Sequence, residues 1–185
     1  MLGDARSGRV VFVAHCILNQ NSVVRELAVR GSLLSEVVRV LEELDLGIVQ
    51  LPCPETLHAG LRRFWQTSDQ YDSIGFRKLC KRLAEQAADL AEEFERNGIR
   101  VVAVIGIRRS PSCGVTETTR GWIGGNPVKA TEYEVVKEPG VFMRVLKKVF
   151  EARGLKPLYA DVDVSRLEDS AKELREVLRD ALCRR

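Results

Sequence analysis

Short apolar runs alternate with amphipathic segments along this chain, and this alternation is the strongest constraint on its fold. The runs are residues 10–14, 47–51, 101–105 and 157–162. The segments with helical apolar spacing are residues 32–44, 73–97, 141–153 and 167–182. The first three runs are rich in the β-branched residues that suit strands covered on both faces. Strand and helix in alternation predict an α/β fold with a doubly wound, mainly parallel sheet flanked by helices on both faces.

Local signals predict where several of these elements begin and end. Ser32 is expected to cap the first long helix, with Glu36 nearby. The long amphipathic segment 73–97 ends at an Asn-Gly pair, which is typical of a helix end. Pro52 and Pro54 are expected to exclude a helix directly after the second run. The glycine-rich stretch 114–125 predicts a loop or hairpin.

The length of 185 residues fits one domain, 1–185, with a core over about 10–154 and a strand-helix extension over about 155–185. With 29 basic and 26 acidic residues mixed along the helices, the net charge is +3, which gives no support for nucleic-acid binding. No apolar run is long enough for a membrane span. The first residues lack a hydrophobic leader, so a cytoplasmic location is expected.

Three cysteines lie just past the ends of the first three apolar runs, at Cys16, Cys53 and Cys113. Open α/β sheets hold ligands outside the carboxyl ends of their strands, so these thiols are expected to meet in one crevice. Three protein ligands leave one position on a metal open for water or substrate, as in catalytic sites. There is no Cys-x-x-Cys pair. The residues alone therefore leave open an iron–sulfur cluster held by distant cysteines or a zinc ion.

The two other cysteines, Cys80 and Cys183, fall on predicted helices. We expect them to be small packing or surface residues without chemistry. A disulfide between them is the alternative, because the high charge content leans toward a thermophile, where intracellular disulfides occur.

Polar residues beside the cysteines are candidates for the remaining chemistry. Glu55 follows Cys53 by two residues and suits a proton donor or acceptor, or an acceptor of backbone hydrogen bonds in its loop. Ser110 and Ser112 flank Pro111, where serine either contacts substrate or stabilises a turn. Arg109 is a candidate anion contact or a solvated charge.

The loop after the second run carries the aromatic residues Phe64, Trp65 and Tyr71. Such rings either anchor a long loop to the core or provide a surface on which a planar ligand stacks.

Three motifs together resemble the TudS family, whose characterised activity is thiouracil desulfidation. They are Ala-His-Cys-Ile-Leu-Asn at 14–19, Leu-Pro-Cys-Pro-Glu at 51–55 and Arg-Ser-Pro-Ser-Cys-Gly at 109–114, and the resemblance runs over about 10–154. It implies a Rossmann-like fold and a [4Fe-4S] cluster bound by Cys16, Cys53 and Cys113. It also implies Glu55 as the acid/base and Ser110 as a second catalytic or binding group.

The activity implied by the resemblance is a desulfidation without net redox change. The iron without a cysteine captures the sulfur of a small thiolated substrate, a thiouracil-like heterocycle or a thioamide, and water then supplies oxygen while hydrogen sulfide leaves. Asn19, Arg109 and Ser112 are the candidate substrate contacts. The first motif departs from the family, which commonly continues Cys-Leu-Leu-Gly where this chain has Cys-Ile-Leu-Asn. This departure bears on the identity of the substrate more than on the binding of the cluster.

Two alternatives and the assembly state stay open. The first alternative is a carrier that stores or delivers sulfur or a cluster without turnover. The second is a thiol hydrolase with Cys113 as nucleophile and a distant histidine, although the chain has only two histidines. Both a monomer and a homodimer agree with the sequence.

Overall fold

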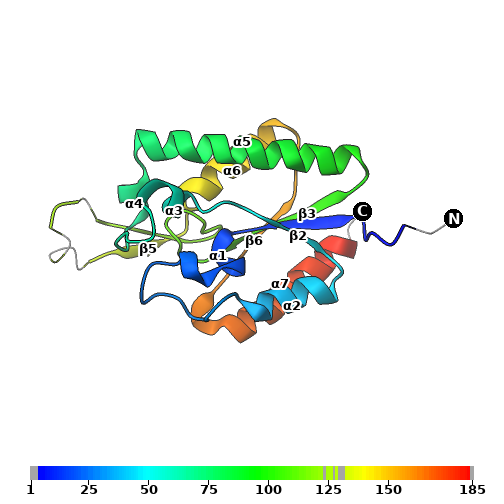
Figure 1. Ribbon diagram of the computed structural model, residues 1–185, viewed down its shortest axis with the longest axis horizontal. Coiled ribbons are helices and arrows are strands. Elements are labelled where there is room, and N and C mark those ends of the chain that lie inside the picture. The colour runs from blue at the N-terminus through cyan, green and yellow to red at the C-terminus, as the bar shows by residue number, and fades with distance from the viewer. Residues whose placement is uncertain (1–3, 123, 127, 129–131, 184–185) are drawn as a thin grey trace.

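The computed structural model describes residues 4–122, 124–126, 128 and 132–183. Its centre is a parallel sheet with the strand order β2-β1-β3-β6 (Figure 1). The strands are β1 (Arg9–Val13), β2 (Gly47–Gln50), β3 (Arg100–Ile107) and β6 (Leu158–Val162). The predicted α/β fold with a mainly parallel sheet is confirmed, and it is of the Rossmann-like kind.

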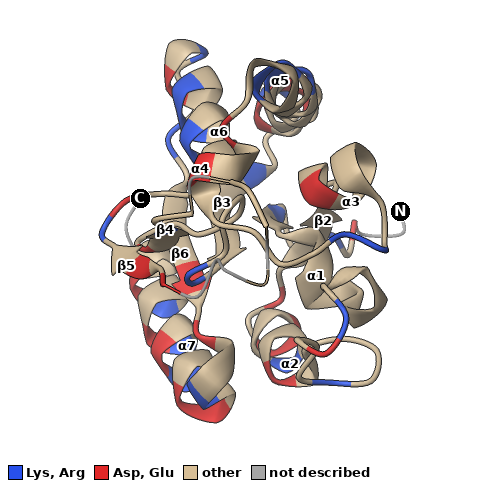
Figure 2. Ribbon diagram, turned by 90° about the vertical axis from the view of Figure 1, so that its left-hand side faces the viewer, with Lys and Arg blue, Asp and Glu red and all other residues tan. Residues whose placement is uncertain are grey.

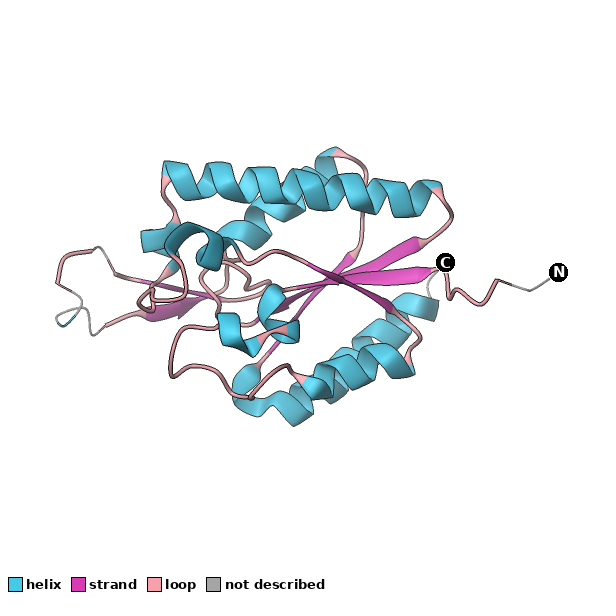
Figure 3. Cartoon of the chain, viewed as in Figure 1, coloured by secondary structure: helices cyan, strands magenta, loops and turns pink. Residues whose placement is uncertain are grey.

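Helices cover both faces of the sheet, as Figures 1 and 3 show. On one face, α5 (Ile74–Arg96) packs beside α6 (Val141–Ala152), and on the other α2 (Ser35–Glu43) packs beside α7 (Leu167–Cys183). The central strands β1 and β3 are almost wholly buried between these layers, which explains their continuous apolar runs, whereas the edge strand β2 is largely exposed. The long helix α5 begins after Ser73, where the sequence predicts its start. The Ser73 hydroxyl caps the helix by accepting a hydrogen bond from the Phe76 amide at 3.2 Å.

Short elements gather at the carboxyl ends of the strands. They are α1 (His15–Leu18), η1 (Gln20–Ser22), α3 (Pro54–Ala59), α4 (Ser68–Tyr71) and η3 (Val164–Arg166). The predicted loop or hairpin is a hairpin of β4 (Thr118–Arg120) and β5 (Glu134–Val136), which projects from the same end of the molecule (Figure 3). The chain runs from β1 outward to β2 and then returns to the other side of β1 as β3. The crevice between β1 and β3 is thus the topological switch point.

Two predictions about helix starts were wrong. The helix α3 begins at Pro54, directly after Cys53, although two prolines were expected to exclude it. Proline is favourable at the first helical position, because the amide hydrogen that it lacks would have no partner there. Ser32 does not cap α2, which begins at Ser35 after Leu34. The carbonyl of Ser32 instead accepts the Gln20 amide at 2.7 Å, which ties the first loop down.

The predicted assignment of the two remaining cysteines as helix residues is confirmed. Cys80 is buried in α5, Cys183 is exposed at the end of α7, and both are free thiols. Within the described part of the chain, no helix combines the length and apolar character that crossing a membrane requires.

Candidate metal centre

All three strand-end cysteines line one cavity of about 520 Å³ at the carboxyl edge of the sheet. Cys16 lies in α1 after β1, Cys53 precedes α3 after β2, and Cys113 lies in the loop after β3. The parallel sheet brings these thiols together from sequence positions almost 100 residues apart, because its strands all point the same way. Figure 2 looks onto this edge, where charged residues mark the flanking helices and also the ribbon around the end of β6.

Local structure holds each thiol in a defined place. The sulfur of Cys53 caps α3: it accepts the Thr56 amide at 3.4 Å and the Thr56 hydroxyl at 3.3 Å. Cys16 sits in the first turn of α1, whose start is tied to the sheet by the Ala14 amide bonding the Ile105 carbonyl at 2.8 Å. The Cys113 amide donates to the Ser110 hydroxyl oxygen at 3.0 Å.

The thiols influence one another electrostatically. Burial, followed by the charges of Cys53 and Glu55, raises the pKa of Cys16 to about 12. Burial, followed by the charges of Cys16 and Cys53, also holds the pKa of Cys113 well above its ordinary range. Several thiolates at this place require a compensating positive charge, which is what a metal centre supplies.

Three thiols line the cavity, but across the described residues no group of three or more His, Cys, Asp and Glu side chains is close enough together to hold a metal ion. Thiolate sulfur is a soft donor, which suits both zinc and iron–sulfur clusters. The donor chemistry therefore leaves both kinds of centre open.

Beside the thiols, Glu55 is the centre of a buried hydrogen-bond network. The Ser112 hydroxyl donates to its Oε1 at 2.5 Å, and the Tyr71 hydroxyl lies 3.5 Å from its Oε2. Ser112 Oγ also lies 3.4 Å from Cys113 Sγ. Burial, and then the charge of Glu55, raises the pKa of Tyr71, which keeps this phenol a proton donor. Ser112 thus connects a carboxylate to one of the three thiols.

Arg63 is a site residue that the sequence analysis did not identify. Its Nε lies 3.2 Å from Glu55 Oε2, and the two side chains are only 4% and 10% exposed. The same guanidinium donates to the carbonyls of Ser22 at 2.8 Å and Gly60 at 3.1 Å and to the Thr56 hydroxyl at 3.3 Å. It therefore links η1 to α3 and to the turn after α3, and it lies against the Glu55 carboxylate beside the cavity. Its only signal in the sequence is a pair of arginines after α3.

The loop that carries Cys113 is packed against two glycines where no side chain would fit. A Cβ at Gly106 in β3 would lie 2.1 Å from the Cys113 carbonyl oxygen, and one at Gly140 would lie 2.6 Å from the Ser112 carbonyl carbon. The carbonyls of Pro111 and Ser112 accept the first free amides of α6, from Val141 and Met143, at 3.0 Å each. The loop thus caps α6, which restricts its conformation.

Asp161, at the end of β6, clamps the same loop from the other side, and the sequence analysis did not identify it either. Its Oδ2 accepts the amides of Val115 at 3.1 Å and Thr116 at 2.8 Å and the Thr116 hydroxyl at 2.9 Å. Its Oδ1 accepts Arg108 Nε at 3.0 Å. One oxygen of this buried carboxylate therefore holds the segment that follows Cys113, and the other holds Arg108, which precedes it. An acidic residue at the end of the fourth predicted strand was the available signal.

The other candidate residues lie at different distances from the chemistry. Ser110 lines the cavity, but its hydroxyl oxygen stabilises the turn, accepting the Ser112 amide at 3.4 Å in addition to that of Cys113. Arg109 also lines the cavity, in a left-handed backbone conformation with φ 65°, and its guanidinium bonds Asp163 at 2.5 Å. Asn19 is not among the lining residues, and its side chain accepts the Asn21 amide at 3.1 Å.

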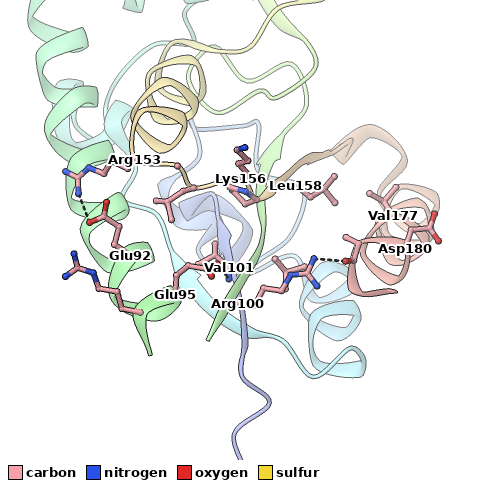
Figure 4. A pocket seen from close by; sticks show the side chains of 15 residues that line it. Glu92, Glu95, Arg100, Val101, Arg153, Lys156, Leu158, Val177 and Asp180 are labelled. Carbon is pink, nitrogen blue, oxygen red and sulfur yellow. Dashed lines mark hydrogen bonds and ion pairs between the residues drawn. The ribbon is translucent and has the colours of Figure 1, made fainter. Parts of the chain in front are cut away.

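A second, larger cavity of about 980 Å³ lies at the opposite edge of the sheet, where β3 and β6 begin (Figure 4). Several of its charged side chains are engaged with the protein: Arg153 lies 3.5 Å from Glu92, and Arg100 donates to the Ala181 carbonyl at 2.9 Å. Glu95 accepts the Val101 amide at 2.8 Å. Among the described residues that line this cavity there is no cysteine or histidine, whereas three cysteines and His15 line the cavity at the carboxyl edge.

Comparison with known proteins places the chain in a family. No family model matches the sequence. The uncharacterized protein MJ0003 of Methanocaldococcus jannaschii is 38% identical to it over 107 residues, which cover 58% of this chain and 68% of the relative. The chain belongs to the MJ0003 family. A solved structure that is similar to this chain is titled a [4Fe-4S]-dependent thiouracil desulfidase, TudS. The similarity has a TM-score of 0.49 and 18% sequence identity, and it covers 90% of this chain and 97% of that one.

Proposed function

We propose that this protein is a desulfidase that replaces the thiocarbonyl sulfur of a small molecule with oxygen from water. The observation that carries the proposal is the meeting of Cys16, Cys53 and Cys113 in one cavity beside the buried pair of Glu55 and Arg63. The motifs that hold these residues resemble those of the TudS family. In the reaction, water provides the oxygen of the new carbonyl group, and its two protons leave with the sulfur as hydrogen sulfide.

The three cysteines are the proposed ligands of a [4Fe-4S] cluster. When bound, such a cluster with one iron free of cysteine supplies a soft Lewis acid for the substrate's sulfur. The chain offers no fourth cysteine to this cavity among the residues that line it. A cluster held by these three cysteines would therefore keep one iron without a protein thiolate, which would be open to the substrate's sulfur.

Glu55 is the proposed acid/base. As a carboxylate paired with Arg63, it is poised to take a proton from water that attacks the thiocarbonyl carbon. Ser112, 2.5 Å from Glu55 Oε1, orients the carboxylate and connects it to the cavity. In this proposal Ser112 assists Glu55 directly, while Ser110 shapes the turn that presents Cys113. Arg109 and Ser112 remain proposed substrate contacts, whereas Asn19 has a capping role.

The deciding experiment is anaerobic reconstitution followed by iron and sulfide analysis and an assay with 2-thiouracil. We expect about four irons and four sulfides per chain, a brown protein, and release of hydrogen sulfide with formation of uracil. A chain that stays colourless and iron-free after reconstitution would contradict the proposal. Loaded protein that releases no sulfide from any thione would favour the alternative, a carrier of sulfur or of the cluster.

A further inference from the structure

The cavity that holds the three thiols has a rim of apolar side chains that the fold leaves uncovered. Leu27 and Val29 are 48% and 36% exposed, and Tyr133 and Val135 are 50% and 47% exposed. All four line this cavity, although they come from the first loop and from β5 with the residues before it. Exposed apolar side chains that converge on one cavity are typical of a binding site, because scattered ones would not share a lining.

One wall of the rim is built from aromatic rings. The rings of Trp65 and Tyr133 lie 4.6 Å apart at 74°, and Trp122 packs edge-on to Trp65, also at 4.6 Å. Trp65 and Tyr133 line the cavity. The three rings connect the loop before α4 to the hairpin of β4 and β5, which makes this wall a continuous apolar surface.

Polar contacts hold the hairpin against α4. The Ser68 hydroxyl donates to the Thr119 carbonyl at 2.8 Å. Asp69 accepts the Gly121 amide at 2.7 Å and pairs with Arg120 at 3.1 Å. The aromatic wall is therefore part of the folded structure, and its position does not depend on a ligand.

A polar group without a partner lies in the same wall. Thr119 is 3% exposed and lines the cavity, and its Oγ1 has no hydrogen-bond partner in the described part of the structure. A buried hydroxyl without a partner costs stability, so a ligand that bonds it recovers this cost on binding. Thr119 lies on β4 and lines the same cavity as Trp65 and Tyr133.

We propose that the substrate is a planar thione whose ring carries a nonpolar substituent. The ring packs against Trp65 and Tyr133, a polar ring atom bonds Thr119, and the substituent lies between Leu27 and Val135. This inference rests on the proposed desulfidase function and adds the part of the substrate that lies away from the sulfur. The opposite wall comes from the first loop, where Val23 and Val24 also line the cavity and where the motif departs from the TudS pattern.

Binding of the oxygen analogues tests this subsite separately from turnover. The affinities of uracil and 6-propyluracil for the anaerobically reconstituted protein would be measured by calorimetric titration. Their affinities for the metal-free chain would be measured by the change in tryptophan fluorescence. The chain's only two tryptophans, Trp65 and Trp122, are in the aromatic wall, so their fluorescence reports on it. Each buried methylene group contributes about fourfold in affinity. We expect 6-propyluracil to bind at least about tenfold more tightly than uracil.

A matched pair of variants locates the effect. Leu27→Gln is expected to remove most of the preference for the propyl group. Leu90→Gln is expected to leave it unchanged, because Leu90 is similarly exposed, at 42%, but lies on α5 away from the cavity. Trp65→Ala is expected to weaken both ligands, and Thr119→Val is expected to do so with the aromatic wall intact.

The possible outcomes separate this inference from the proposed function. Equal affinity for the two ligands, no binding of either, or an equal effect of the Leu27 and Leu90 substitutions would overturn the subsite. Sulfide release from 2-thiouracil without a propyl preference would leave the desulfidase function standing alone. A clear propyl preference without sulfide release from 6-propyl-2-thiouracil would keep the ligand subsite and contradict the desulfidase function.

Discussion

Each of the two edges of the sheet has a cavity, and the larger cavity is not the one that contains the reactive side chains. The cavity at the amino edge is nearly twice as large, about 980 Å³ against about 520 Å³. Several of its charged side chains pair with one another or with main-chain groups. The smaller cavity at the carboxyl edge holds three thiols and a buried ion pair. Volume therefore does not identify the site here, whereas reactive side chains brought together from separate strands do.

The difference has a geometric cause. At the carboxyl edge, the segments after β1, β2 and β3 each carry one cysteine that lines the cavity. At the amino edge, the chain enters the strands from the ends of α5 and α6, which present long charged residues to solvent. The predictions below test whether function is confined to the carboxyl edge, in order of decreasing effect.

Removing one thiol is expected to have the largest effect. Cys113→Ser should reduce bound iron after reconstitution to a background level and abolish sulfide release, since the cavity then offers only two thiol ligands. Cys183→Ser is the matched control, because Cys183 is exposed at the end of α7, the helix that lines the amino-edge cavity. Iron analysis and the sulfide assay check both variants. Full iron loading of Cys113→Ser would contradict the proposed ligand set.

Neutralising the proposed acid/base is expected to lower turnover while leaving the metal centre intact. Glu55→Gln keeps the size of the side chain but removes the charge that accepts a proton, so kcat should fall by about 100-fold or more. Iron content and the visible spectrum should not change. Glu95→Gln at the amino edge is the control, with unchanged kcat expected. A carrier protein would retain its cluster and its delivery function in both variants. An equal kcat for Glu55→Gln and Glu95→Gln would therefore contradict the catalytic role of Glu55.

Asp161 is expected to contribute both to the free energy of unfolding and to the conformation of the loop that carries Cys113. In Asp161→Asn the amide group cannot accept hydrogen bonds from the Val115 and Thr116 amides and from Arg108 at the same time. We expect a loss of about 2 kcal/mol in the free energy of unfolding and weaker cluster retention. Urea unfolding of the metal-free chain and iron loss under a chelator measure the two effects. Asp180→Asn, exposed at the amino-edge cavity, should change neither, and a loss of the same size there would remove the distinction.

The smallest effects are expected at the amino edge. Arg100→Gln and Arg153→Gln remove cations from the larger cavity, yet sulfide release should change by less than about twofold, because these surface pairs contribute little. Steady-state kinetics of both variants checks this. A tenfold loss in either one would mean that the larger cavity takes part in function, and the contrast between the two edges would have to be abandoned.

Sequence patterns anticipated the layers and strands because burial on both faces leaves a local signature. They also placed the three thiols at one edge, since that follows from parallel strands alone. They did not identify Arg63 or Asp161, whose partners are distant in the chain or in irregular loops. The helix at Pro54 was missed because the expectation considered what proline cannot do inside a helix and not what it suits at the start.

The amino-acid sequence by itself determined the α/β architecture and the edge at which the cysteines lie, because apolar periodicity and strand direction are local or topological properties. Only the tertiary structure decided which side chains meet there. Ser112 contacts Glu55 while Ser110 stabilises the turn, and side chains from the first loop, the segment before α4 and the hairpin form one rim. Loop side chains take their direction from close packing with distant partners, such as the fit of the Cys113 loop against Gly106 and Gly140, and such contacts leave no period in the sequence.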